Sequence, residues 1–180
     1  MLKITVPAAE FWDEVHEEFI YKKEQTLQLE HSLVSLSKWE SKWTKAFLGK
    51  QEKTDEEIID YVRCMTLTQN IDPEVYTRLS ADNYARINAY IEAPMTATYF
   101  SEDKQTKGNR EVVTSELIYY WMISYNIPVE FQKWHLNRLL TLIRVCSVKN
   151  NPPKKKSKRD LMRRNAALNA ARRHRLNSRG

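Results

Sequence analysis

Residues 26–43 read TLQLEHSLVSLSKWESKW and change their hydrophobic period halfway along. In the first part, Leu27 and Leu29 alternate with polar residues, which is typical of a half-buried strand. The second part has large hydrophobic residues every three or four positions, as on one face of a helix: Leu33, Leu36, Trp39, Trp43 and then Phe47. The stretch predicts a strand followed directly by a helix, and we expect the sheet of that strand to pack on this helix.

The preceding residues supply the partners of the strand. Residues 2–6, LKITV, are rich in β-branched side chains and stop at Pro7, and residues 18–21, EFIY, form another short apolar run. We predict an antiparallel sheet of two or three strands within residues 1–30. Carboxylates surround His16 in EVHEEF, residues 14–19. A metal or acid–base site is one interpretation, but a solvated charged turn is favoured.

The helix after this sheet has two candidate starts and one predicted end. Ser32 and Ser37 are both good N-caps. Gly49 is predicted to end the helix as its C′ residue, because glycine adopts a positive φ at little cost. Trp39 and Trp43 lie four residues apart on one face. They share it with leucines, so core packing is favoured over a platform for stacking bases.

The rest of the body is expected to be helical, because three glycines are too few for the turns of a mainly β domain. A capping box, Thr54 with Glu57, starts a helix whose apolar face is predicted to be Ile58, Ile59, Val62 and Met65. Residues 72–79 open with Asp-Pro, which predicts a short helix. Another helix is expected from Ser80 until just before Pro94.

Two apolar segments follow a polar stretch around Gly108 that we expect to be an exposed loop. Residues 111–126 are apolar nearly all round, which predicts a central, buried helix. The next helix is expected to enter at Pro128, with an apolar face made of Phe131, Trp134, Leu139, Leu142, Ile143 and Cys146. We therefore predict an α+β fold, mainly helical, in which a small N-terminal antiparallel sheet packs against a helical bundle. A detached basic helix is expected to follow at the C-terminus.

The charge of the chain is divided unevenly. Residues 152–180 hold eleven Lys and Arg against one acidic residue, Asp160, a net charge of +10. The chain has 29 basic and 23 acidic residues, so the remainder keeps 18 and 22, a net charge of −4. Pro152 and Pro153 cannot continue a helix. We predict an acidic body at 1–150, made of the sheet at 1–30 and helices at 31–150, and a Pro-Pro hinge with a basic helix at 151–180.

The basic segment carries the candidate binding residues. Residues 158–176 hold no Pro or Gly and predict a helix with a thin Leu and Ala stripe, which folds fully only against a partner. Its partner is expected to be an acidic protein surface, the acidic body of a neighbouring subunit or, as the minority view, nucleic acid. The predicted partner-binding residues are Lys154, Lys155, Lys156, Lys158, Arg159, Arg163, Arg164, Leu168, Arg172, Arg173 and Arg175.

A search for catalytic chemistry finds no motif of weight. Among the four histidines there is no pair at metal-ligand spacing, and no Gly-rich phosphate loop or nucleophile motif occurs. His135 is interpreted as a structural residue, and Cys64 and Cys146 as buried thiols. We expect no enzyme activity, cofactor or metal. No signal peptide or membrane span is predicted, so the expected location is the cytoplasm.

Several segments together resemble one family. TLQLEHSLVSLSKWESKW, MTATYF, TSELIYYWMI, IPVEFQKWHLNRLLTLIRVC and LNAARRHRLNSRG are similar to small proteins encoded among the tail genes of tailed bacteriophages and prophages, the tail assembly chaperones. The resemblance covers nearly the whole chain. It implies a non-enzymatic protein in the host bacterial cytoplasm that binds the long, helical tape measure protein, helps to recruit tail tube subunits and leaves the finished virion. It implies no catalytic residue and no assignable binding motif.

Two other functions remain open at the level of sequence. A structural virion protein of the tail or neck would use the basic segment to contact a neighbouring subunit or DNA. A small nucleic-acid-binding regulator is disfavoured by the acidic body, which repels polyanions. Self-association into a homo-oligomer is compatible with each of these functions.

Overall fold

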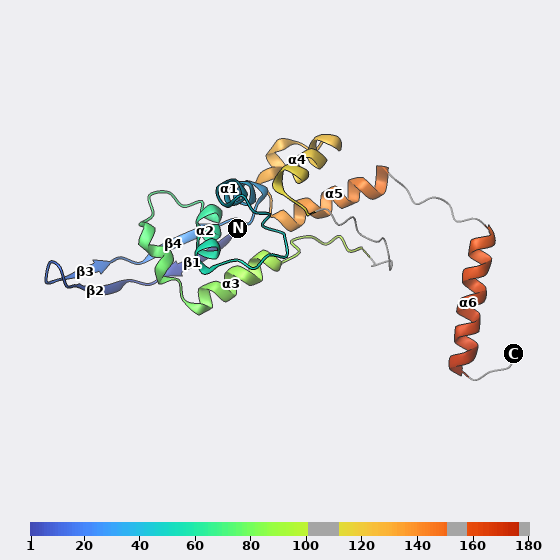
Figure 1. Ribbon diagram of the computed structural model, residues 1–180, viewed down its shortest axis with the longest axis horizontal. Helices are drawn as coiled ribbons and strands as arrows, with labels where there is room; N and C mark the ends of the chain where they lie inside the picture. The colour runs from blue at the N-terminus through green and yellow to red at the C-terminus, as the bar shows by residue number, and fades with distance from the viewer. Residues whose placement is uncertain (101–111, 151–157, 177–180) are drawn as a thin grey trace. The chain divides into compact units, whose positions relative to one another are not determined.

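The structure is a computed structural model that describes residues 1–100, 112–150 and 158–176. It has an α+β fold, mainly helical, with small antiparallel sheets near the N-terminus (Figure 1). The chain divides into a compact unit at Met1–Cys146 and a second unit at Ser147–Gly180. Within the described ranges, no helix has the length and apolar character needed to cross a membrane. The predicted loop around Gly108 and the Pro-Pro hinge lie outside the described residues.

The N-terminal region forms two separate two-stranded antiparallel sheets, not the single sheet of two or three strands that was predicted. β1 (Leu2–Val6) pairs antiparallel with β4 (Gln25–Leu29), and β2 (Ala9–Asp13) pairs antiparallel with β3 (Glu18–Lys22). β2 was not predicted, because Phe11 and Trp12 are adjacent in the sequence and no alternating pattern marks this strand. The alternation in β4 is confirmed, since Leu27 and Leu29 are fully buried.

Helix α1 (Leu33–Trp43) starts where one of the two predicted caps lies. Ser32 is its N-cap and forms a capping box with Ser35. The predicted end at Gly49 is wrong, because Thr44 adopts the left-handed conformation, with φ of 51°, and ends the helix five residues earlier. The side chain of Glu40 then accepts a hydrogen bond of 2.9 Å from the main-chain N–H of Phe47. A contact made after the helix therefore helps to set its end.

The next three helical segments begin at the predicted caps. α2 (Asp55–Met65) has the Thr54 and Glu57 capping box, the 3-10 helix η1 (Pro73–Arg78) is capped by Asp72, and α3 (Ala81–Glu92) is capped by Ser80. The apolar face predicted for α2 is only partly right. Val62 and Met65 are buried, but Ile58 is exposed, and Glu57, Asp60 and Tyr61 are buried in its place. The carboxylates tolerate burial because both have partners: Lys42 and Trp43 of α1 contact Asp60, and Lys45, which follows α1, pairs with Glu57.

The second half of the unit departs further from the prediction. α4 (Ser115–Ser124) buries Ser115, Ile118 and Met122, while Tyr120 and Ile123 are exposed, so it is not the central buried helix that was expected. Its apolar composition exceeds what its single packed face needs.

The single helix expected after Pro128 is divided into the 3-10 helix η2 (Val129–Lys133) and α5 (Leu136–Asn150). The chain breaks at His135, where Ser32 and His135 form an isolated bridge and the N–H of Leu136 donates 2.7 Å to the carbonyl of His31. Phe131 and Trp134 stack on each other, with ring centroids 3.9 Å apart, and lie outside α5.

The buried side chains form two clusters, and α1 contributes to both. Trp39 belongs to the cluster that contains the inward residues of β1, β4, α2 and α3. Leu33 and Leu36 belong to the cluster that contains Ile118, Met122, Leu136, Leu139 and Ile143. The prediction that the sheet packs on α1 is therefore confirmed, and α1 also packs against the later helices of the unit. In the second unit, α6 (Lys158–Leu176) has the bounds predicted from sequence.

Candidate protein-binding surfaces

An apolar pocket lies between α2 and α3. Its volume is about 620 Å³. Ile58, Ile59 and Val62 line it from α2, Tyr84, Ile87 and Ile91 line it from α3, and Phe47 and Tyr61 complete its apolar lining. Pockets of this size lined mainly by apolar side chains are the usual places where proteins take ligands or anchor side chains. We call it the α2–α3 groove.

Three polar residues stand at the lining of the groove: Lys53, Asp55 and Asn88. The ammonium of Lys53 lies 4.6 Å from the ring centroid of Phe47, a cation–π contact. Phe47 in turn stacks on Tyr61 at 3.8 Å between centroids. The groove therefore has an aromatic wall and two residues of opposite charge, a combination that suits an amphipathic segment better than a purely apolar ligand.

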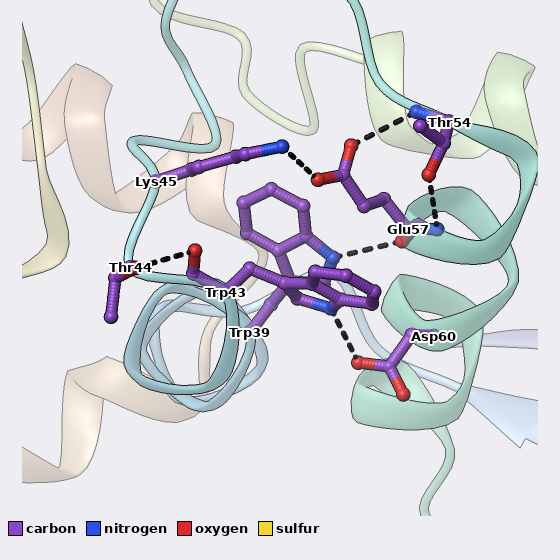
Figure 2. A network of polar contacts seen from close by, with 7 residues as sticks. All are labelled: Trp39, Trp43, Thr44, Lys45, Thr54, Glu57 and Asp60. Carbon is purple, nitrogen blue, oxygen red and sulfur yellow. Dashed lines mark hydrogen bonds and ion pairs between the residues drawn. The ribbon is translucent and has the colours of Figure 1, made fainter.

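The wall formed by α2 is fixed to α1 by buried polar contacts (Figure 2). The indole N–H of Trp39 donates a hydrogen bond of 2.8 Å to the carbonyl of Glu57. The indole N–H of Trp43 donates one of 2.9 Å to Oδ2 of Asp60. Trp39 is buried, so the prediction that it packs in the core rather than stacking on bases is confirmed.

A cluster of charges completes this seam. Lys45 pairs with the side chain of Glu57, whose other oxygen accepts 2.9 Å from the N–H of Thr54. These two donors hold the pKa of Glu57 below its usual range, against the effect of burial. The first turn of α2 is thereby held in place, and with it one side of the groove.

Histidine and cysteine positions show structural roles. Nε2 of His135 lies 2.9 Å from the carbonyl of Tyr90, as expected for a structural residue. His31, which sequence reasoning did not single out, is buried with Nδ1 2.6 Å from the hydroxyl of Tyr61. Cys64 and Cys146 are free thiols that are partly, not fully, buried.

The charged turn around His16 is solvated, as favoured from the sequence. The turn residues are exposed, and Nδ1 of His16 lies 2.7 Å from Oδ2 of Asp13. That contact and the N–H of Val15 hold the pKa of Asp13 below its usual range. Within the part of the chain that the structure describes, no group of three or more His, Cys, Asp or Glu residues is arranged to hold a metal ion.

The predicted partner-binding residues fall on α6 or outside the described ranges. Lys154, Lys155 and Lys156 lie outside, and Lys158 is the first residue of α6. The remaining predicted residues are all exposed on this helix: Arg159, Arg163, Arg164, Leu168, Arg172, Arg173 and Arg175. Arg164, Leu168 and Arg172 are spaced by four, so basic side chains flank the leucine on one face. The Leu and Ala stripe is therefore interrupted by charge.

Sequence reasoning missed two surfaces, the α2–α3 groove and an aromatic face on the β2–β3 pair. The groove needs two helices that meet only in the folded chain. The second had a visible signal, since Phe11, Trp12, Phe19 and Tyr21 flank an acidic turn. Comparison of the chain with protein-family models, curated proteins and solved structures gives no match.

Proposed function

We propose that this protein is a tail assembly chaperone of a tailed bacteriophage, which binds the tape measure protein in the host cytoplasm without catalysis. The observation that carries the proposal is the α2–α3 groove, whose lining is apolar apart from Lys53, Asp55 and Asn88. The tape measure proteins of such phages are long and helical, and their exposed apolar stripes need cover before assembly. The resemblance of the sequence to the chaperone family supplies the choice of partner.

The groove suits an amphipathic helix. Such helices insert apolar side chains spaced three or four residues apart, and their polar flanks remain at the rim. A volume of about 620 Å³ accommodates a few large side chains, not a whole helix. Lys53 and Asp55 line the groove and offer one charge of each sign to the polar flanks of an inserted helix. Binding of this kind is modest and reversible, which suits a factor that leaves the assembled tail.

The basic helix α6 supplies the second attachment in this proposal. Its seven Lys and Arg residues against one Asp give it a net charge of +6, and it is joined to an acidic body. Charge-driven contacts of this kind speed association more than they tighten it. The predicted residues from Lys154 to Arg175 would contact an acidic protein surface, with tail tube subunits and other copies of the chain as candidates.

Co-expression with the tape measure protein tests the proposal. We expect the intact chain to raise the soluble fraction of the tape measure protein several-fold, and mass spectrometry of purified virions to find no copies of the chain. Absence of rescue together with presence in virions would overturn the proposal and favour the structural virion protein. If the chain neither rescues the tape measure protein nor occurs in virions, the proposal is also overturned.

A further inference from the structure

The β2–β3 pair has an open aromatic face. Strand register places Glu10 opposite Tyr21 and Trp12 opposite Phe19, so these four side chains share one face of the sheet. Trp12, Phe19 and Tyr21 are 52%, 66% and 64% exposed. The rings of Trp12 and Phe19 meet edge to face, with centroids 4.9 Å apart. We call Glu10, Trp12, Phe19 and Tyr21 the aromatic hairpin face.

The opposite side of the same pair is attached to the rest of its unit. Lys22 lies on that side and forms ion pairs of 3.1 Å with Asp72 and 2.9 Å with Glu74, at the start of η1. In Figure 1 the β2–β3 pair extends beyond the helices of the unit, with its turn farthest away. A two-stranded sheet is marginally stable by itself, and three neighbouring exposed aromatic side chains are typical of a surface that binds a partner.

The charge around this face specifies a cationic partner. Glu10 lies within it, Glu14 and Glu17 are exposed in the turn that follows, and Glu18 is exposed at the start of β3. Aromatic rings beside carboxylates fit arginine in particular, because a guanidinium stacks on rings and pairs with a carboxylate through two parallel hydrogen bonds. The same carboxylates repel phosphate, so nucleic acid is a poor occupant.

We propose that the aromatic hairpin face binds helix α6 of a second copy of this chain. Arg164, Leu168 and Arg172 lie on one side of α6, with an exposed leucine between two arginines. Eight residues of helix separate the two arginines by about 12 Å. Glu10 lies in β2 and Glu14 is the first residue of the turn that follows, so their Cα atoms are at most about 14 Å apart. Leu168 then contacts Trp12 and Phe19, while each arginine reaches one of the two glutamates.

This contact joins different surfaces of the two copies. A heterologous contact leaves one free hairpin and one free helix on every pair, so copies add head to tail and close into rings only if the rotation permits. The proposed function gives α6 an acidic protein surface as its partner without identifying it, and the aromatic hairpin face of a second copy is such a surface. It does not depend on the groove, because the groove and the hairpin share no residue.

The test uses four full-length proteins, treated with nuclease and studied by sedimentation velocity over a range of concentrations. The hairpin variant carries Glu10→Gln and Glu14→Gln, and the helix variant carries Arg164→Gln and Arg172→Gln. A control variant carries Glu24→Gln and Glu52→Gln, which remove the same charge at exposed positions elsewhere. Circular dichroism verifies that all four are folded. The tape measure rescue assay, run in parallel, reports on the groove separately.

We expect the wild type and the control to associate at low salt and to dissociate as salt rises. Each of the other variants alone should associate at least about 10-fold more weakly. Their equimolar mixture should regain association and stop at a 1:1 dimer, since it contains one intact hairpin and one intact helix. A wild type that stays monomeric at every concentration would overturn the inference, and this is also the result expected if α6 docks on the hairpin of its own chain. So would association that needs added DNA, or a mixture that regains nothing.

Discussion

The carboxylate of Glu40 joins two parts of the chain that lie 75 residues apart. Its Oε2 accepts a hydrogen bond of 2.7 Å from the main-chain N–H of Ser115, the first residue of α4, and its Oε1 accepts one of 2.9 Å from Phe47. Glu40 is buried. One side chain therefore satisfies a donor at the start of α4 and a donor after the end of α1, and it connects the helices of the second buried cluster to the first.

Removal of this carboxylate should destabilise the first unit. Glu40→Ala leaves two main-chain donors without their acceptor, and each unsatisfied buried group costs about 1–3 kcal/mol. We expect the free energy of unfolding to fall by about 2–4 kcal/mol in urea titrations. The matched control is Glu24→Ala, at an exposed position, which should stay within about 0.5 kcal/mol of the wild type. Equal losses in the two variants would show that the Glu40 contacts contribute nothing.

The two tryptophans of α1 should respond differently to loss of their indole N–H. Trp39→Phe removes the indole donor to the carbonyl of Glu57 and leaves a void in the core, so we expect a loss of about 2–3 kcal/mol. Trp43→Phe should cost about 1 kcal/mol or less, because Asp60 keeps its ion pair with Lys42. Urea unfolding of the two variants tests this order, and a reversed order would contradict it.

The stability of the fold should decrease as the pH falls below 6.5. Burial, with His135 as a second cause, lowers the pKa of His31 to about 4, whereas a histidine in an unfolded chain titrates near 6.5. Between these values the unfolded chain binds a proton that the folded chain does not. This effect is absent above pH 7, and at pH 5 it lowers the free energy of unfolding by roughly 2 kcal/mol. Burial also lowers the pKa of His135, which adds in the same direction.

Urea unfolding at pH 7.5 and pH 5 measures this effect in the wild type, in His31→Gln and in His174→Gln. The His31 variant should lose less stability between the two pH values than the wild type, because it cannot take up this proton. The control at His174, an exposed residue of α6, should behave as the wild type does. A His31 variant with an unchanged pH dependence would mean that other groups cause the loss.

A charge in the α2–α3 groove should abolish partner binding without unfolding the chain. Ile58 lines the groove and is 39% exposed, so Ile58→Asp should lower the free energy of unfolding by about 1 kcal/mol or less. Under the proposed function, the soluble tape measure protein recovered by co-expression should fall to the level seen without this chain. Ile123→Asp is the control, since Ile123 is 75% exposed on α4 and lies outside the groove. Retained rescue by the Ile58 variant would exclude the groove as the binding surface.

Deletion of residues 152–180 should leave the first unit folded. Every residue of the compact unit Met1–Cys146 is retained, and so is the whole of α5. We expect calorimetry to give a melting transition within about 2 °C of that of the full chain, since the deleted segment belongs to the second unit and not to the compact one. Aggregation or a large fall in the melting temperature would place the basic segment in the core.

The sequence by itself determined the features that depend on residues close together in the chain. The caps at Ser32, Thr54 and Ser80 bond to groups three residues away, so they could be identified from spacing alone. Strands β1 and β4 carried their pattern within five residues, and α6 held no helix breaker between its ends. These features are governed by local geometry and were predicted correctly.

The tertiary structure decided the other features, because contacts with residues distant in the chain determine where a helix ends and which side chains are buried. Helix α1 ends at Thr44, not near Gly49, where Glu40 receives donors from Phe47 and Ser115. Asp60 and Glu57 of α2 are buried because α1 and the residues just after it bring Lys42, Trp43 and Lys45 to their carboxylates. The apolar surface of α4 and the aromatic hairpin face stay exposed in the described unit, although hydrophobicity alone predicts burial. Hydrophobic periodicity states which side chains can be buried, but only the packing of distant elements determines which of them are covered.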